Sequence, residues 1–217
     1  MKNVTYFLMI FFSLLMGVMI AGCETTDQEG EGGMGELGET LVVAGMVYSG
    51  DGSDGMTASF LGEKSVGNSL RLESANHGVI LKRKGKTTYE GEATREISTY
   101  GAILQLYSVV EMEFDKESPT QIKRLKISAK NTVKGDDSSV IIVDVELKDL
   151  PFSWFDFRSY AGDEGASDWA KQHAYYGYFT GKDLSKNVVS WEINVNGKIE
   201  QRTNFTDLSM TLHYAFQ

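Results

Sequence analysis

Aromatic side chains gather in one segment of this chain, at residues 152–179, where ten Phe, Trp and Tyr residues lie among charged and amide side chains. Flat amphipathic rings beside planar polar groups suit stacking on a sugar or contact with a protein. A second interpretation is that the rings close an open end of a sheet, although an apolar plug would not need so many charges. The candidate ligand-binding residues are Trp154, Phe157, Tyr160, Trp169, Tyr176 and Tyr178.

Catalytic motifs are absent from the sequence, which contains no G-x-S-x-G, H-E-x-x-H or P-loop pattern. Glycoside hydrolysis needs two facing carboxylates, which Glu111, Glu113, Asp156 or Asp168 would have to supply. Glu111 and Glu113 alternate with apolar residues, and an exposed strand face explains that pattern. We therefore predict no catalytic residue, with a glycan-acting hydrolase as the alternative.

Metal ligands are sparse. The three histidines, His77, His173 and His213, are far apart in the sequence, so a zinc site has no support. Acidic, Gly-rich stretches at 49–55 and 162–168 would offer oxygen ligands to calcium, but neither has the EF-hand spacing. Solvated turns explain both stretches, and we predict no cofactor.

One short turn is strongly basic. Lys82, Arg83, Lys84 and Lys86 surround a single glycine, Gly85. Such a cluster suits a phosphate or an acidic glycan, and a solvated hairpin tip is the simpler interpretation.

The only cysteine, Cys23, follows an uncharged apolar run at residues 4–21 that is preceded by Lys2. This order of a basic end, an apolar core and small residues is typical of a secretory signal peptide. Ile20-Ala21-Gly22-Cys23 resembles the lipobox of bacterial lipoproteins. The resemblance implies that residues 1–22 are removed and that Cys23 is acylated, which anchors the chain in a membrane.

Residues 23–40 then form the acylated cysteine and a Gly- and Glu-rich segment with few apolar groups. Such a segment cannot offset its ordering entropy by burial, so we expect a flexible tether. Glu24 stands where inner-membrane lipoproteins usually carry aspartate, and the acidic run resembles a surface-export signal of Bacteroidota lipoproteins. Both resemblances imply the outer membrane, with the domain facing the cell surface as a further expectation.

The formal net charge is −9 at pH 7. Nucleic-acid binding requires a basic surface, so an acidic chain argues against such a partner. The expected partners are the membrane, through the anchor, and a glycan or an envelope protein.

Residues 41–217 show a hydrophobic period of two. The clearest example runs from Leu104 to Phe114, and similar runs lie near 125–129, 141–147 and 189–195. This pattern predicts a single antiparallel β-sandwich, with a lipocalin-like barrel as the alternative and one short helix near 167–176. No opening Gly-Trp signature of lipocalins lies near 41–49.

Two hairpin registers follow from the same pattern. A three-residue loop, 195–197, would pair Ile193 with Ile199 and keep apolar groups on one face. A similar loop, 83–85, would pair Leu81 with Thr87. From all these features we expect a non-enzymatic binding lipoprotein of the cell envelope; the alternatives are the hydrolase and a lipocalin-like carrier of an apolar ligand.

Overall fold

The computed structural model describes residues 37–49, 56–60, 78–99, 102–115, 120–156, 174–181, 185–203 and 208–216. All of them belong to one compact unit, Met34–Gln217. Cys23, Phe157, Tyr160 and Trp169 lie outside the described residues, so their predicted roles stay predictions.

The described residues form a 12-stranded antiparallel sheet. Its strands are β1 (Thr40–Ser49), β2 (Met56–Phe60), β3 (Val79–Arg83), β4 (Thr88–Thr99), β5 (Ala102–Phe114), β6 (Ile122–Val133), β7 (Asp136–Lys148), β8 (Ser153–Asp156), β9 (Ala174–Gly181), β10 (Val188–Val195), β11 (Lys198–Gln201) and β12 (Leu208–Phe216). A 3₁₀ turn, Ser185–Asn187, precedes β10. The described residues contain no helix long and apolar enough to cross a membrane.

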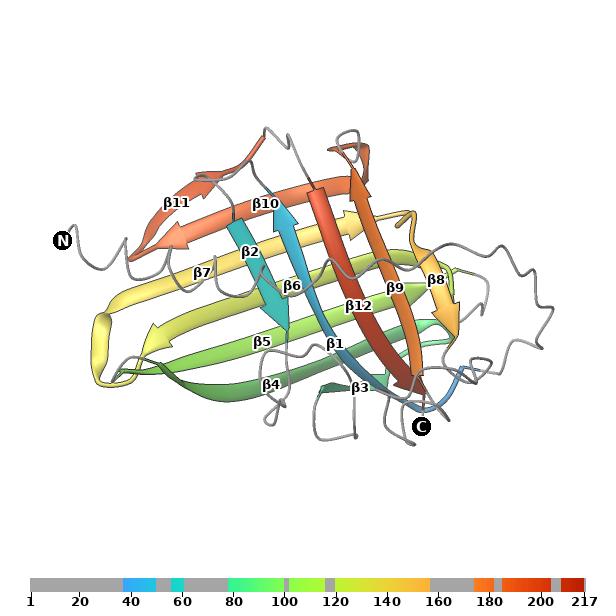
Figure 1. Cartoon of the computed structure of the whole chain (residues 1–217), viewed down its shortest axis with the longest axis horizontal. Coiled ribbons are helices and arrows are strands. Elements are labelled where there is room, and N and C mark those ends of the chain that lie inside the picture. The colour runs from blue at the N-terminus through green and yellow to red at the C-terminus, as the bar shows by residue number, and fades with distance from the viewer. Residues whose placement is uncertain are drawn as a thin grey trace. The chain divides into compact units, whose positions relative to one another are not determined.

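The sheet folds into two layers (Figure 1). Its strand order is β11-β10-β7-β6-β5-β4-β3-β1-β12-β9-β8, and β2 pairs with β1 beside β3. The back layer comprises β11, β10, β7, β6, β5 and β4, and the front layer comprises β2, β1, β12, β9 and β8, whose strands cross those behind. β3 joins the two layers because it pairs with β4 on one side and β1 on the other.

This arrangement confirms the all-β, sandwich-like prediction and corrects the barrel alternative. β11 and β8 end the strand order without pairing to each other, so the sheet is open. The predicted helix near 167–176 is wrong at its end, because residues 174–176 begin β9 and pair with β12. Residues 167–173 lie outside the described residues.

One core lies between the layers. Inward residues of β5, β6 and β7, among them Val110, Ile127 and Val145, pack against Val43 of β1 and Leu212 of β12. The predicted alternation of β5, β6 and β7 is confirmed. At one end, the rings of Tyr89, Phe114, Tyr214 and Phe216 meet with centroids 5.5 to 5.9 Å apart.

The folded domain begins before Leu41, which corrects the predicted end of the tether at Thr40. Leu37 is buried in the core, and the carbonyl of Gly38 accepts a hydrogen bond from the Tyr89 hydroxyl at 2.6 Å. Thr40 is the first residue of β1. Leu37 supplies the apolar burial that the Gly- and Glu-rich residues before it lack.

Gly91 of β4 is required where β3 and β4 approach each other. A Cβ atom at this position would lie 2.1 Å from the Ile80 carbonyl oxygen and 2.9 Å from Leu81 Cδ2. The first of these contacts is with backbone, which cannot rotate away. We expect Gly91→Ala to lower the free energy of unfolding by about 1 to 3 kcal/mol, as overpacking does.

Urea unfolding of Gly91→Ala and of Thr94→Ala, an exposed position on the same strand, measures this effect. The Thr94 variant is expected to stay within about 0.5 kcal/mol of the parent. Equal urea midpoints for the two variants would contradict this expectation, because β3 and β4 would then accommodate the added Cβ without loss of stability.

Candidate interaction face

The outer face of the back layer is charged. Outward positions of β4 to β7 carry acids and bases that alternate with core residues. These residues, which we call the charged face, are Glu90, Glu92, Glu96, Glu111, Glu113, Arg124, Lys126, Lys130, Asp144, Glu146 and Lys148.

Ion pairs cross the charged face from strand to strand. Arg124 Nε donates a hydrogen bond to Glu146 Oε1 at 2.7 Å, which lowers the pKa of the Glu146 carboxyl. Lys126 Nζ lies 3.5 Å from Glu111 Oε1. Pairs of this kind on an exposed sheet contribute little stability each but keep the face hydrated.

Two of the carboxylates considered for glycoside chemistry, Glu111 and Glu113, have basic partners in the described structure. Glu111 lies near Lys126 and Arg124, and Glu113 accepts a hydrogen bond from Lys123 at 3.0 Å. They border a shallow hollow of about 190 Å³ on the charged face. The Asp156 side chain and Asp168 lie outside what the structure describes.

The described part of the chain adds no support for a metal site. Within the described ranges, no group of three or more His, Cys, Asp or Glu side chains is arranged to hold a metal ion. The acidic stretches at 50–55 and 162–168 fall outside those ranges.

Three strands of the front layer have no acidic or basic side chain other than His213. β1, β12 and β9 lie side by side, and none of them contains Asp, Glu, Lys or Arg. The outward side chains of β1 and β12, together with Tyr178 of β9, form what we call the uncharged face. On β1 and β12 these residues are Val42, Ala44, Met46, Tyr48, Ser209, Thr211, His213 and Ala215.

A second apolar group occupies the uncharged face. Val42, Ala44 and Ala215 are at most 1% exposed, yet they do not belong to the core cluster between the layers. The register explains this, because Val42 pairs with Ala215 and Ala44 with His213, one residue out of phase with the core positions. β1 is therefore apolar on both sides.

Tyr178 is an exposed aromatic residue of the uncharged face. It is 39% exposed and lies opposite Ser153 of β8 on one side and Thr211 of β12 on the other. Directly opposed side chains in a sheet lie about 5 Å apart at Cβ. The row Ser153, Tyr178 and Thr211, which we call the Tyr178 row, thus places a ring between two hydroxyl-bearing residues.

The structure distributes the predicted aromatic residues as follows. Trp154 lies in β8 opposite Gly177, and Tyr176 lies in β9 between Phe155 and His213; their side chains lie outside what the structure describes. Tyr178 is exposed. The segment 152–179 thus contributes two paired strands, β8 and β9, which the sequence pattern did not reveal.

Sequence reasoning missed the contribution of β1. Met46 and Tyr48 are half-buried on the uncharged face, and neither lies near an aromatic cluster in the sequence. The available signal was the run at residues 41–47, LVVAGMV, because a strand that is apolar on successive positions has both faces covered or in contact.

Comparison with family models, curated proteins and solved structures gave no match for this chain. The chemistry of the two faces therefore has to carry the assignment of function.

Proposed function

We propose that this chain is a lipid-anchored protein of the bacterial cell envelope that binds a neutral glycan, without catalysis, at the Tyr178 row. The observation that carries the proposal is an exposed tyrosine between two hydroxyl-bearing residues, beside strands that contain no Asp, Glu, Lys or Arg. A tyrosine ring packs against the apolar face of a sugar, and neighbouring hydroxyls accept and donate hydrogen bonds to its hydroxyl groups.

The lack of charge argues for a neutral ligand. An acidic or basic glycan would find no Asp, Glu, Lys or Arg of β1, β12 or β9 to pair with its charges, and burying an unpaired charge is costly. The charged face has the opposite character and keeps the domain soluble. The anchor at Cys23 and the outer-membrane location come from the lipobox resemblance and are part of the same proposal.

A thermal-shift titration of the mature lipidated protein in detergent micelles tests the glycan proposal. We expect one neutral polysaccharide of an envelope and plant panel to raise the melting temperature saturably. Truncating a central aromatic contact typically costs 2 kcal/mol or more in binding. Tyr178→Ala is therefore expected to weaken that binding at least about tenfold.

Tyr107→Ala is the matched control. Tyr107 is 36% exposed but lies on the outer face of the back layer, where its hydroxyl donates a hydrogen bond to Glu92. This variant should bind the glycan like the parent protein. Equal weakening by both variants would contradict a site at Tyr178.

If the glycan titration gives no shift, the alternative partner at the same face is an envelope protein. A photoreactive amino acid at position 178, compared with one at 107, then distinguishes a protein contact in intact cells. A discrete adduct formed only from position 178 would replace the glycan with a protein partner at the same face.

A further inference from the structure

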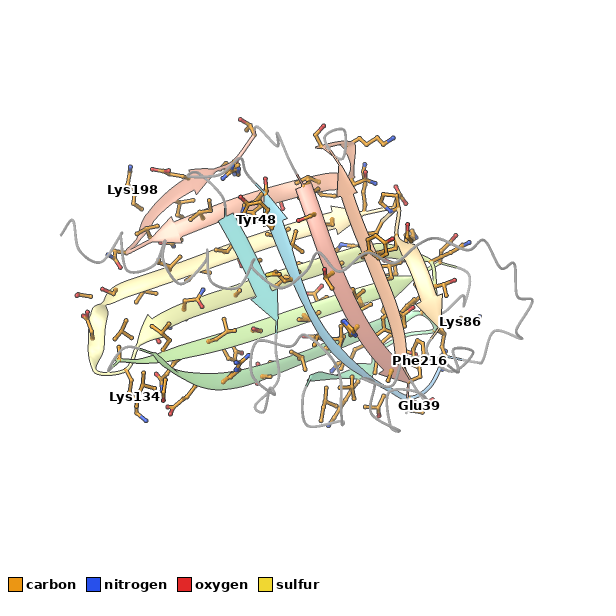
Figure 2. All side chains as sticks on the ribbon, in the orientation of Figure 1. Glu39, Tyr48, Lys86, Lys134, Lys198 and Phe216 are labelled. Atoms are coloured by element: carbon orange, nitrogen blue, oxygen red, sulfur yellow. The ribbon has the colours of Figure 1, made fainter. Side chains whose placement is uncertain are left out.

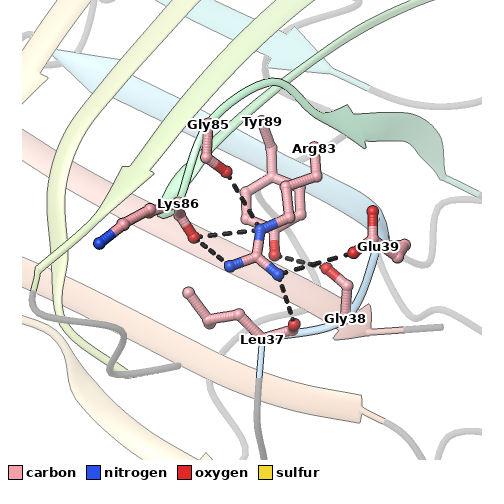
Figure 3. Close-up of polar contacts among 7 residues, drawn as sticks. All are labelled: Leu37, Gly38, Glu39, Arg83, Gly85, Lys86 and Tyr89. Carbon is pink, nitrogen blue, oxygen red and sulfur yellow. Dashed lines mark hydrogen bonds and ion pairs between the residues drawn. The ribbon is translucent and has the colours of Figure 1, made fainter.

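The N-terminal end of the folded domain is fastened to the hairpin between β3 and β4 (Figure 3). The Arg83 guanidinium donates a hydrogen bond to the Leu37 carbonyl at 3.2 Å and lies 3.8 Å from the Glu39 carboxylate. The Tyr89 hydroxyl donates to the Gly38 carbonyl, and burial raises the pKa of this phenol, so it remains a donor. The backbone that follows the tether therefore leaves the domain at this hairpin.

The same arginine shapes the hairpin tip. Arg83 Nε donates to the carbonyl oxygens of Gly85 and Lys86, both at 3.1 Å, so the loop wraps around the guanidinium. Figure 3 shows the Lys86 side chain pointing away from that guanidinium. Lys82, Lys84 and Lys86 are all exposed, and Lys84 has a carboxylate of Glu90 at 4.0 Å.

This hairpin tip is basic in a chain of formal charge −9. Elsewhere, Lys123, Lys126, Lys134 and Lys198 each have a glutamate carboxylate within 4.0 Å. Lys82 and Lys86 have none among the described residues. Both lysines are exposed, although Glu90 lies opposite Lys82 in the strand pairing, so Lys86 is the more available of the two to an external anion.

If Cys23 is acylated, the length of the segment after it sets the expected distance between this hairpin and the membrane. Thirteen residues, 24–36, separate the predicted acylated Cys23 from the fastened Leu37. A flexible chain of that length has a root-mean-square span of about 20 Å. A short tether of this kind keeps the hairpin at a high local concentration next to the headgroups.

We propose that Lys82, Lys84 and Lys86 contact anionic phosphate headgroups of the bilayer that holds the acyl chains. This proposal rests on the lipid anchor of the proposed function. The three lysines match phosphate in charge, and their hairpin is bonded to Leu37, the first described residue of the domain. Each lysine at an anionic surface is worth roughly a fivefold change in binding.

The contact would orient the domain. β1 begins at Thr40 beside the hairpin and ends at Ser49, and strands rise about 3.3 Å per residue. Figure 2 places Lys86, Glu39 and Phe216 together, with Tyr48 toward the opposite end of β1. With the hairpin on the headgroups and β1 running away from them, Tyr48 lies roughly 25 Å farther out. The Tyr178 row, which is in register with Met46 of β1, then also stands clear of the membrane.

Lysine labelling of the mature protein in vesicles tests this placement. Protein whose acylation has been verified by mass spectrometry is reconstituted in phosphatidylcholine vesicles with or without 30% phosphatidylglycerol. Only protein on the outer leaflet is labelled, by a membrane-impermeant amine reagent. We expect labelling of Lys84 and Lys86 to slow at least about fivefold in anionic vesicles and to recover at 1 M salt.

Lys198, at the far edge of the back layer, is the internal control and should label alike in both vesicles. Equal labelling of Lys84 and Lys86 in both vesicles would overturn the placement and leave the anchor standing. Protection in both vesicles would also overturn it, because the acidic tether would then occupy the lysines. Protein without an acyl group would overturn the anchor and the placement together.

Discussion

Trp191→Ala is expected to lower the free energy of unfolding by about 3 to 5 kcal/mol, the usual cost of removing a large core side chain. Trp191 is 2% exposed and is among the largest fully buried side chains of the core. It lies on β10 opposite Val145, so the cavity would open between the two layers. Urea or thermal unfolding measures the loss.

Val189→Ala is the control on the same strand, two residues away. Sequence alternation predicts that Val189 and Trp191 share the core face, but Val189 is 52% exposed. The register of β10 against β7 shifts between Val188 and Ser190, and such a bulge turns the preceding residues out of phase. We expect the Val189 variant to lose less than about 0.5 kcal/mol.

The two variants together test whether the bulge is real. A large loss for Val189→Ala, or a loss below 1 kcal/mol for Trp191→Ala, would contradict the register of β10. The sequence alternation predicts equal burial of Val189 and Trp191, whereas the bulged register exposes Val189. The two variants distinguish these two predictions.

Strand faces were predictable where burial is one-sided. Ser108, Val110 and Met112 of β5 point inward as their alternation predicts, because a one-residue slip would move the whole apolar set to solvent. Burial of one face therefore fixed the orientation of the long strands. The same argument failed wherever that condition was absent.

The hairpin between β10 and β11 shows such a failure. Val195 pairs with Lys198 and Ile193 with Glu200, so the loop has two residues and the predicted three-residue loop is wrong. All four residues of β11 are exposed, with Ile199 at 57%, so no buried face selects the register. Asn196 and Gly197 both have positive φ, at 52° and 87°, as the two-residue type I′ turn requires.

The hairpin between β3 and β4 fails for another reason. Arg83 pairs with Tyr89, so the loop is longer than the predicted 83–85, and Leu81 does not oppose Thr87. The amide of Lys84 donates to the Thr88 carbonyl to close it. Arg83 also binds Leu37, 46 residues away, and a contact at that separation leaves no trace in local pattern.

The sequence identified Tyr178 as a candidate site residue but did not predict which residues lie beside it. Tyr178 is conspicuous in the sequence as part of an aromatic cluster, and its role as a ligand contact stays a prediction. Its neighbours Ser153 and Thr211 come from strands before and after it in the chain. Only the pairing of β8, β9 and β12 brings them together, and pairing between distant strands is not encoded in their periodicity.

Cys23→Ser is expected to abolish acylation of the chain. The chain has one cysteine, so the variant contains no thiol to accept a diacylglycerol group. Each buried CH₂ of an acyl chain contributes about 0.8 kcal/mol, and stable anchoring needs two or three chains. Without them, the lipobox interpretation offers no lipid group to hold the mature domain on the bilayer.

Membrane fractionation and intact-mass analysis of the expressed chain measure this effect. The parent protein should partition with membranes and carry the mass of its acyl groups, whereas the variant should lack that mass. Thr25→Ser, two residues farther on, is the matched control and should behave like the parent. A Cys23→Ser protein that still carries acyl mass would overturn the lipobox interpretation. The argument that the hairpin between β3 and β4 faces the membrane would then fail as well.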